Sequence, residues 1–431
     1  MDQAISKVID IINGGAVVST DSRKIQKNTN TVFIALKGEH HNGNAFAKQA
    51  IKKGAVLAVI DNPKYENENT ILVDDTLEFL QKLSLEYRKQ FDIDVIAITG
   101  SNGKTTTKDL IRDVLSKKYN VLATQGNLNN HIGVPLTLLN LKPEHDFAVI
   151  EMGASHQGEI RQLCELALPN YGLITNIGKA HLEGFGGFDG VVKTKSEMYD
   201  YIRDITGKVF VHKTNSLLMQ LSQGIEQILY GDSDLQEELR YSGGEHHFLH
   251  FETETPNAEY EIKTQLVGDY NYENVLAAIS VGETFDVDTK DITDAIADYQ
   301  PLDKRSQWYE SEKNKIIIDY YNANPSSMRV AIDNFLKLET DKKLMILGDM
   351  LELGDSSSLE HHAIIDAIRN VYKCRIILVG KEFWRANSGS FMCFKDIDET
   401  LAFFYQNPVN NHTILIKGSR GMKMENLLSV L

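Results

Sequence analysis

A glycine-rich turn constrains this chain more than any other feature of its sequence. It consists of Gly100, Ser101, Asn102, Gly103, Lys104, Thr105, Thr106 and Thr107, and it lies between an apolar run (94–99) and a helical pattern. Glycines let backbone N–H groups point at an anion, a lysine reaches the terminal phosphates, and a hydroxyl binds Mg²⁺. The turn therefore predicts a phosphate-binding loop, shorter than the general form, which has a glycine where this chain has Ile98. A glycine-rich turn with an incidental lysine is the alternative, but a lysine followed by three threonines favours the loop.

Length, charge and cysteine content narrow the class of protein. A chain of 431 residues exceeds one typical domain, so two or three domains are expected. The formal net charge of −15 argues against a nucleic-acid partner or an acidic membrane surface. Three scattered cysteines without a C-x-x-C pair indicate a reducing compartment and no cysteine metal site. No apolar stretch approaches the roughly 20 residues of a membrane span, so we expect a cytoplasmic protein without membrane insertion.

Alternating strand and helix patterns predict an α/β fold with three domains. Residues 1–88 predict a small α/β N-terminal domain, and residues 89–300 predict a central, mostly parallel sheet of the P-loop type. Residues 301–431 repeat the alternation and predict a Rossmann-like C-terminal domain. The polar, β-like stretch 234–263 is expected to be an insertion at a sheet edge. The expected strands are 31–36, 55–60, 70–73, 95–99, 147–151, 171–176, 315–319, 343–347, 375–379 and 413–417.

Polar side chains follow neighbouring strands of the predicted central sheet, where ligands of parallel sheets bind. Glu151 ends one apolar run, and His181 follows the next one along the chain. With Thr105 they would lie on one rim, and carboxylate, imidazole and hydroxyl groups can all bind a divalent cation. Taken singly, Glu151 could cap a helix and His181 could belong to a surface loop. Lys195, in a helical stretch, reads from composition alone as an exposed lysine.

At this point the chain resembles the Mur ligase family of ATP-dependent ligases, over essentially its whole length. The first motifs that carry the resemblance are TGSNGKTTT (99–107), EMGASHQGEI (151–160), TNIGKAHLEGFG (175–186) and KTKSE (193–197). Further motifs are residues 19–55, 268–278, 319–328, 347–362 and 417–425. The last two favour the members that add D-alanyl-D-alanine to UDP-N-acetylmuramoyl-tripeptide. Sister ligases, folylpolyglutamate synthetase and a regulatory P-loop switch or kinase are the rival interpretations.

The resemblance implies a magnesium site with two ions. It replaces the separate interpretations of Glu151 as a helix cap, His181 as a loop residue and Lys195 as an exposed lysine. Thr105, Glu151, His181 and Lys195 match the family's metal-binding positions. In the family the lysine at the position of Lys195 is carbamylated by CO₂, which turns a cationic arm into a carboxylate. The interpretation of Lys195 as an ordinary exposed lysine is therefore disfavoured by the resemblance.

ATP is the nucleotide that the resemblance implies, bound by residues 100–106. Asn271 and Asn274 are three positions apart, so on a helix they share a face and can present amides to adenine. The resemblance places Arg305 at the phosphates when the third domain closes. It assigns three residues of the C-terminal domain to the nucleotide pocket: Tyr321, Asn322 and Asn324. Simple turn chemistry remains the alternative for the two asparagines, because Asn-Ala-Asn-Pro also makes a good turn.

Two further groups of residues match substrate contacts of the family. Asn130 matches a loop that contacts the acceptor carboxylate, with His131 as an alternative register. Four residues of the first domain match its contacts to the uridine diphosphate: Ser22, Arg23, Asn42 and Gly43.

The reaction implied is amide formation through an acyl phosphate, the last cytoplasmic step of UDP-N-acetylmuramoyl-pentapeptide synthesis for peptidoglycan. The tripeptide carboxylate takes the γ-phosphoryl group of ATP, and the amine of D-alanyl-D-alanine then displaces phosphate. Charge neutralisation is the main catalytic task, because two anions must meet. The catalytic residues expected are Lys104, Glu151, His181, Lys195, Arg305 and Asn130. A monomer is expected.

Overall fold

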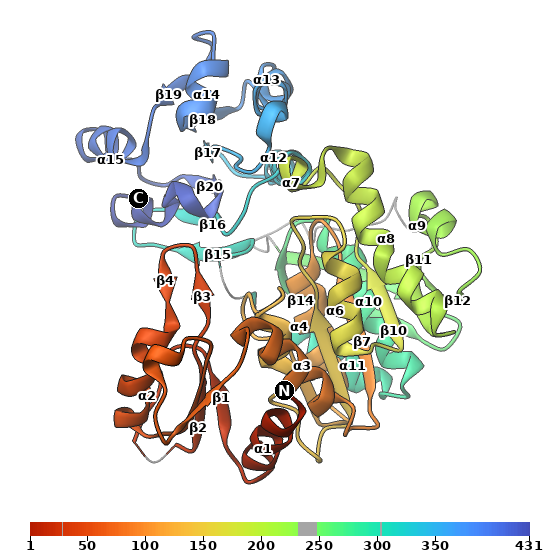
Figure 1. The fold of residues 1–431 in the computed structure, drawn as a ribbon. Helices are drawn as coiled ribbons and strands as arrows, with labels where there is room; N and C mark the ends of the chain where they lie inside the picture. Colours follow the sequence, from red (N-terminus) through yellow and green to blue (C-terminus); the bar gives the residue numbers. More distant parts are fainter. Residues whose placement is uncertain (28, 232–247, 302–303) are drawn as a thin grey trace.

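The computed structural model describes residues 1–27, 29–231, 248–301 and 304–431, and its α/β architecture confirms the expected fold class (Figure 1). Each strand expected from the sequence is present, with ends within about two residues of those expected. The described residues form a four-stranded sheet, two six-stranded sheets and two small two-stranded ones. Within the described part of the chain, no helix is long and apolar enough to cross a membrane.

The first sheet is parallel, in the order β1-β2-β5-β6. Its strands and their small companion hairpin are β1 (Val17–Ser19), β2 (Thr31–Ile34), β3 (Lys37–Gly38), β4 (His41–Asn42), β5 (Ala55–Ile60) and β6 (Thr70–Leu72). Its helices are α1 (Asp2–Asn13), η1 (Gly43–Phe46), α2 (Ala47–Lys53), η2 (Pro63–Tyr65) and α3 (Thr76–Arg88). Apolar side chains of α1 and α3 belong to the core that covers one face of the next sheet. Tyr87 Oη also donates to Leu141 O at 2.9 Å, which ties α3 to the middle of the chain.

The second sheet is parallel throughout, in the order β12-β11-β10-β7-β9-β8. Its strands are β7 (Asp94–Thr99), β8 (Val121–Ala123), β9 (Phe147–Glu151), β10 (Tyr171–Ile174), β11 (Lys208–His212) and β12 (Glu226–Tyr230). In β7, Val95 and Ala97 enter the core on one face, whereas Ile96 and Ile98 enter the core on the other. Burial on both faces explains why these strands read as continuous apolar runs.

Helices cover both faces of this second sheet (Figure 1). The helices that contribute to the core shared with α1 and α3 are α5 (Gly133–Leu138), α6 (Glu159–Ala167), α8 (Phe188–Asp204) and α9 (Ser216–Leu221). Those of the opposite core are α4 (Lys104–Leu115), α10 (Asn271–Thr284) and α11 (Thr289–Asp298). A one-turn helix, α7 (Leu182–Phe185), follows β10 and joins a third core instead.

The stretch expected as an edge insertion is built differently. Residues 232–247 lie outside the described part, but β13 (Phe248–Glu254) and β14 (Glu259–Val267) pair antiparallel as a separate two-stranded sheet. The expectation of an insertion at an edge of the main sheet was therefore wrong for the described residues. The alternating burial along β14 explains the separate sheet, because one of its faces packs on the core of α4, α10 and α11.

The third sheet has the order β15-β16-β20-β17-β18-β19, parallel except for β15 at its edge. Its strands are β15 (Gln307–Glu310), β16 (Lys315–Asp319), β17 (Lys343–Gly348), β18 (Cys374–Val379), β19 (Met392–Phe394) and β20 (Thr413–Lys417). Its helices are α12 (Pro325–Lys337), η4 (Gly354–Ser356), α13 (Ser357–Ile368), α14 (Lys381–Ala386), α15 (Ile397–Gln406), η5 (Arg420–Met422) and η6 (Met424–Ser429). Figure 1 shows the carboxyl-terminal sheet above the other two.

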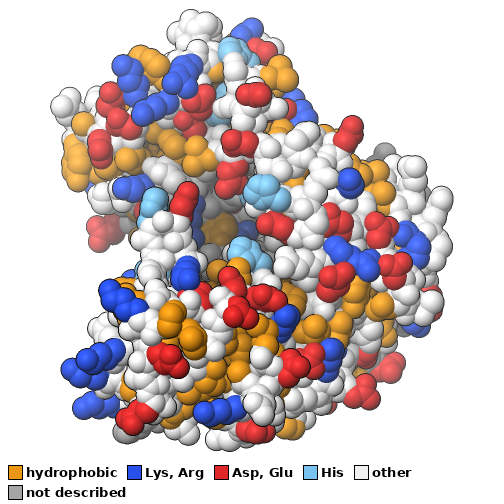
Figure 2. Space-filling model, viewed as in Figure 1, with side chains coloured by type: hydrophobic (Ala, Val, Ile, Leu, Met, Phe, Trp, Pro, Cys, Tyr) orange, Lys and Arg blue, Asp and Glu red, His pale blue; other side chains and the backbone are white. Residues whose placement is uncertain are grey.

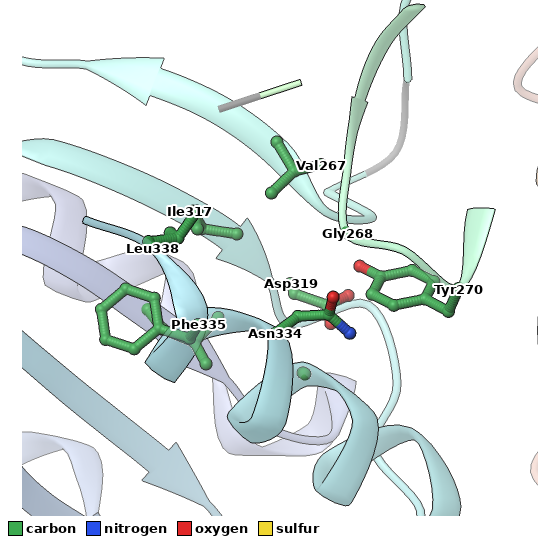
Figure 3. Close-up of a pocket in the computed structure, with 10 residues that line it drawn as sticks. Val267, Gly268, Tyr270, Ile317, Asp319, Asn334, Phe335 and Leu338 are labelled. Atoms are coloured by element: carbon green, nitrogen blue, oxygen red, sulfur yellow. The ribbon is translucent and has the colours of Figure 1, made fainter. Parts of the chain in front are cut away.

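The joint between the second and third sheets contains a small cavity of about 20 Å³, room for about one water molecule (Figure 3). Val267 and Tyr270 line it from the β14–α10 side, while Ile317 and Phe335 line it from β16 and α12. Beside the cavity, Lys337 Nζ pairs with Asp269 Oδ2 at 2.7 Å. The cavity is thus lined by apolar side chains together with Asp319 and Asn334, and an ion pair lies beside it.

Candidate functional site

The phosphate loop is fixed by close backbone contacts. Gly100 has a φ of 147°, and a Cβ there would lie 1.9 Å from Thr175 Oγ1, so a side chain cannot be accommodated. Ser101 Oγ donates to Gly178 O and accepts from Gly178 N, both at 2.9 Å. Gly103, with a φ of 81°, is the N-cap of α4. The loop therefore delivers the N-terminal end of α4 to the carboxyl edge of the sheet, where unpaired N–H groups favour an anion.

Lys104 begins α4 and folds back over the loop. Its Nζ donates to Gly100 O at 2.7 Å and to Ser101 O at 3.3 Å. Burial lowers the pKa of the Lys104 amine to about 8, an effect that Glu151 opposes and Arg305 reinforces. A lysine held in this way places its positive charge within the loop, at the position where phosphates would bind.

Glu151 lies at the carboxyl end of β9 and is almost completely buried, with 1% of its surface exposed. Thr105 Oγ1 donates to Glu151 Oε2 at 2.8 Å, and Asn129 Nδ2 donates to Oε1 at 2.7 Å. No helix starts at this point, since α6 begins at Glu159 with Gly158 as its N-cap, so the helix-cap alternative was wrong. The pairing of Glu151 with Thr105 brings two predicted magnesium ligands together.

Lys195 is buried in α8, with 2% of its surface exposed, so its interpretation as an exposed lysine was wrong. Its Nζ lies 3.3 Å from Thr99 Oγ1 and 5.7 Å from the centre of the Phe185 ring. Burial, reinforced by the nearby charge of Lys104, lowers the pKa of this amine to about 7. A large neutral fraction near neutral pH suits an amine that reacts with CO₂, because only the neutral form is nucleophilic.

His181 is the N-cap of α7 and contacts Glu352, in the loop that follows β17. It has a left-handed backbone conformation, with a φ of 51°. Its Nδ1 lies 2.5 Å from Glu352 Oε2, and its ring contacts Phe185 edge-on at 6.1 Å. His181 is therefore more than a surface-loop residue, because it has a specific partner in the C-terminal part of the chain.

The donor set fits Mg²⁺ in its chemistry. Carboxylate and hydroxyl oxygens suit this hard ion, which keeps several waters and needs few protein ligands. Thr105 and Glu151 supply such oxygens in direct contact. No group of three or more His, Cys, Asp or Glu side chains that could hold a metal occurs among the described residues. The oxygen donors in contact at this sheet edge are therefore those of Thr105 and Glu151.

Asn271 and Asn274 begin α10 on one face, as expected from their spacing. Asn274 Nδ2 donates to Asn271 Oδ1 at 3.0 Å, and Thr107 Oγ1 donates to Asn274 Oδ1 at 3.0 Å. A Cβ at Gly103 would lie 2.6 Å from Asn274 Oδ1. These contacts place the two amides directly behind the phosphate loop.

Arg305 enters the site from the segment that leads into the third sheet. Its guanidinium lies 3.7 Å from the centre of the Tyr321 ring, at stacking distance. Its Nε is buried and has no hydrogen-bond partner among the described residues. A buried, unpaired guanidinium donor beside Lys104 fits an anionic ligand, and this observation supports a triphosphate at the loop.

Asn322 and Asn324 have local roles, and one of them also spans the site. Asn324 caps α12 by accepting from Ser327 N at 2.8 Å, which confirms the turn and cap chemistry. Its Nδ2 also donates to Asn102 Oδ1 at 2.8 Å, linking the third sheet to the phosphate loop. Asn322 Oδ1 accepts from the neighbouring Ala323 N at 2.9 Å.

Of the residues expected at the uridine diphosphate, Ser22 and Arg23 follow β1, Asn42 ends β4 and Gly43 begins η1. Arg23 makes two side-chain hydrogen bonds of 2.9 Å to Asp21, and they lower the pKa of Asp21 to about 2. Lys53 Nζ donates to Ser22 O at 3.0 Å. Asn42 is the N-cap of η1, and its side chain accepts a hydrogen bond from Asn44 N. Figure 2 shows a recess between this part of the molecule and the carboxyl-terminal part, with acidic and histidine side chains at its rim.

Asn129 is the site residue that sequence reasoning missed, one position from the residue it selected. Asn130 Oδ1 accepts from Ile132 N at 3.1 Å and Gly133 N at 2.9 Å, so its side chain organises the start of α5. Asn129, in contrast, bonds Glu151 directly. No local sequence signal distinguishes Asn129 from Asn130, because the contact of Asn129 is with Glu151, which lies on a separate strand.

Replacing these two asparagines separates their roles. Asn129→Ala should lower kcat by about tenfold or more, because a hydrogen bond to a charged group is worth about 1.5–3 kcal/mol. Asn130→Ala should mainly lower stability, by about 1 kcal/mol, as for the loss of a helix cap. Steady-state kinetics and thermal unfolding of both variants check this. A larger kinetic loss in Asn130→Ala would instead support the predicted contact of Asn130 with the acceptor.

Comparison with known proteins decides the family. Three models match in order: the Mur ligase family catalytic domain (16–88), the Mur ligase middle domain (98–282) and the Mur ligase glutamate ligase domain (304–420). The chain is 34% identical to UDP-N-acetylmuramoyl-tripeptide–D-alanyl-D-alanine ligase of Bacillus subtilis, over 96% of this chain and 92% of the relative. The chain belongs to the Mur ligase family.

Further relatives of this Mur ligase cover almost all of it. The enzyme of the same name from Escherichia coli is 33% identical, over 99% of this chain and 98% of the relative. The crystal structure of MurF from Acinetobacter baumannii superimposes with a TM-score of 0.85, at 32% identity, over 96% of this chain and 92% of that one. MurF of Thermotoga maritima in complex with ADP gives a TM-score of 0.83 at 25% identity, covering 98% and 97%.

Proposed function

We propose that this protein is the ligase that joins D-alanyl-D-alanine to UDP-N-acetylmuramoyl-tripeptide at the expense of ATP, for peptidoglycan synthesis. The observation that carries the proposal is the convergence of Lys104, the Thr105–Glu151 pair and buried Lys195 at one sheet edge. Relatives that carry this enzyme's name, 30–34% identical over most of their length, support the choice of substrates. The reaction is placed in the cytoplasm, where ATP and a UDP-linked precursor are available.

The residues of this chain divide the work of the reaction. Lys104 and the N-terminal end of α4 hold the phosphates of ATP, and Arg305 neutralises charge from the opposite wall. The tripeptide carboxylate then takes the γ-phosphoryl group, which gives an acyl phosphate and ADP. The amine of the dipeptide attacks the acyl carbon, and phosphate leaves. None of these side chains needs to transfer a proton in the first step.

Magnesium would be held by Glu151 and Thr105, with His181 and a carbamate on Lys195 completing two ion sites. When bound, Mg²⁺ supplies charge neutralisation for the triphosphate. Asn271 and Asn274 are proposed to contact adenine, and Tyr321, Asn322 and Asn324 to line the facing wall of the nucleotide pocket. Support for the carbamate comes from the burial of Lys195 and the lowered pKa of its amine.

Other parts of the proposal concern the rest of the chain. Ser22, Arg23, Asn42 and Gly43 are proposed to bind the uridine diphosphate, and Asn130 the acceptor carboxylate. Domain boundaries near residues 88 and 300 and a monomeric state stay predictions.

The proposed function is tested by phosphate release from ATP with Mg²⁺ and UDP-N-acetylmuramoyl-tripeptide, with and without D-alanyl-D-alanine. Release is expected only with both substrates, and mass spectrometry should detect a product one dipeptide unit heavier. Release that requires a single amino acid in place of the dipeptide would favour a sister ligase. ATP hydrolysis indifferent to either substrate would favour a nucleotide-dependent switch.

A further inference from the structure

The loop after β17 reaches across the joint and contacts the residue expected to bind metal. Glu352 Oε2 lies 2.5 Å from His181 Nδ1, and Glu183 N donates to Glu352 O at 3.4 Å. A Cβ at Gly354 would lie 3.0 Å from Glu183 Cβ, so the two backbones approach closely. The loop after β17 therefore contacts both His181 and the helix α7 that follows it.

Apolar packing fixes this loop against the site. Leu353 is buried in one cluster with Leu182 and Phe185 of α7. The ring of Phe185 in turn contacts His181 edge-on, and Lys195 Nζ lies over it at 5.7 Å. The position of the loop is thereby linked to the edge of the sheet that carries the proposed metal ligands.

Both residues of the His181–Glu352 contact have an unusual backbone. His181 has a φ of 51° and Glu352 a φ of 62°, in the left-handed region that side chains other than glycine's seldom occupy. Each such residue persists only where its surroundings determine it. Here two such residues face one another across the joint, so their contact depends on both parts of the chain.

The chemistry of the contact suits a metal-binding imidazole. A histidine that binds a metal through one ring nitrogen commonly donates its other N–H to a carboxylate, which fixes the tautomer and the ring orientation. Glu352 occupies Nδ1 of His181, which leaves Nε2 as the ring nitrogen that a metal ion would use. We propose that Glu352 is a positioning residue that orients His181 for metal binding, so that the C-terminal part of the chain completes the metal site of the middle part.

The same joint supplies a matched control for a purely mechanical role. Lys179 Nζ pairs with Glu360 Oε1 at 2.6 Å, and Lys179 N donates to Ser326 Oγ at 3.0 Å. This pair also links the segment between β10 and α7 to the C-terminal part of the chain, but it does not involve His181. If ion pairs act here only by holding the parts together, loss of either pair has the same effect.

The experiment measures Mn²⁺ binding to the full chain with ADP present, by the electron paramagnetic resonance signal of free Mn²⁺, and needs no turnover. Glu352→Met should weaken binding about tenfold, the lower end of the range for such orienting partners. Glu352→Gln should retain most of the affinity, because an amide oxygen accepts the same hydrogen bond. Glu360→Gln should stay within about twofold of the wild type. Glu352 is 61% exposed, so these variants are expected to fold.

A double-variant cycle and the histidine tautomer complete the test. If Glu352 acts through His181, Glu352→Met should add nothing to the loss caused by His181→Ala. Nitrogen-15 NMR should place the His181 proton on Nδ1 in the wild type and show its partial transfer to Nε2 in Glu352→Met. Unchanged Mn²⁺ binding in Glu352→Met, an equal loss in Glu360→Gln, or an added loss in the double variant would each overturn the proposal.

The inference rests on the proposed function, because that function makes His181 a metal ligand. The two fail differently. A wild-type protein that binds Mn²⁺ through His181 but forms no dipeptide product contradicts the proposed function and leaves the role of Glu352 supported. A wild type that forms the product with Mn²⁺ affinity insensitive to Glu352 contradicts only the inference.

Discussion

Replacing Lys195 by methionine is expected to abolish amide formation and, at the same time, to stabilise the protein. Activity should fall at least about 100-fold, because a proposed charge-positioning group is lost from a site that works by electrostatic stabilisation. Methionine keeps the length of the side chain and its apolar stem without the buried amine. The free energy of unfolding near neutral pH should rise by roughly 1–3 kcal/mol, since burying an ammonium group is costly.

The stability difference depends on pH in a defined direction. The pKa of the Lys195 amine is about 7 in the folded protein, below the 10.5 of an ordinary lysine. Below pH 7 both states carry the charge, so the folded wild type bears the full cost of burial. Between about pH 7 and 10.5 the unfolded state binds the additional proton, so this cost disappears as pH rises. Denaturant unfolding without Mg²⁺, nucleotide or CO₂ should thus show the advantage of Lys195→Met at pH 6.5 and little of it at pH 10.

The opposite outcome would be informative. Lys195→Met that is less stable than the wild type at pH 6.5 would mean that the amine is paired in the folded state rather than exposed to an apolar environment. Activity within about tenfold of the wild type would remove Lys195 from the catalytic proposal. Lys193→Met, two positions away on the same helix, is the matched control and should change neither quantity.

Lys104→Met should lower kcat about 100- to 1,000-fold, the range for loss of one preorganised charge at a developing anion. Its amine already sits in the loop, bonded to Gly100 O and Ser101 O, so the charge needs no rearrangement to meet the phosphates. The KM for ATP should rise as well, because the same charge attracts the substrate in its ground state. Steady-state kinetics at varied ATP concentration check both effects.

A lysine beyond the far end of α4 provides the control. Lys117 Nζ lies 3.7 Å from Asp298 Oδ2, away from the phosphate loop, and Lys117→Met should leave both constants unchanged. Product formation by Lys104→Met within about threefold of the wild type would show that the loop does not act on the phosphates in the way proposed.

The sequence predicted the phosphate loop well because all of its parts are adjacent in the chain. A strand, a left-handed glycine and a lysine at a helix start are local features, and the structure contains each of them. Glu151 was found by a rule almost as local, since it ends a buried parallel strand. Its partner Thr105 belongs to the loop itself, so their contact followed from the order of the strands.

The burial of Lys195 could have been predicted from the helical spacing of its apolar neighbours, which composition alone does not take into account. Val191, Met198, Tyr199 and Ile202 lie four positions before it and three, four and seven positions after it, and all are buried. This spacing defines one face of a helix, and Lys195 lies in the middle of that face. The helical period, rather than the residue type, would have identified a buried amine.

Contacts between distant parts of the chain could not be predicted in this way. Asn129 and Asn130 have the same chemistry, and only the turn of their loop directs one of them at Glu151. Glu352 meets His181 through two left-handed residues and the packing of two separate sheets. No pattern within either segment specifies the other, so such pairs appear only when the parts are assembled.

Sheets and apolar cores divide this chain differently, which limits how its parts can be exchanged. The first sheet is separate, yet α1 and α3 share one apolar core with a face of the second sheet. A cut after Arg88 would therefore expose apolar side chains on both resulting pieces. The third sheet has two cores largely of its own, joined from outside mainly by α7, Val191 and Val267. A recombinant exchange between related enzymes therefore has a natural crossover point between α11 and β15, and none between α3 and β7.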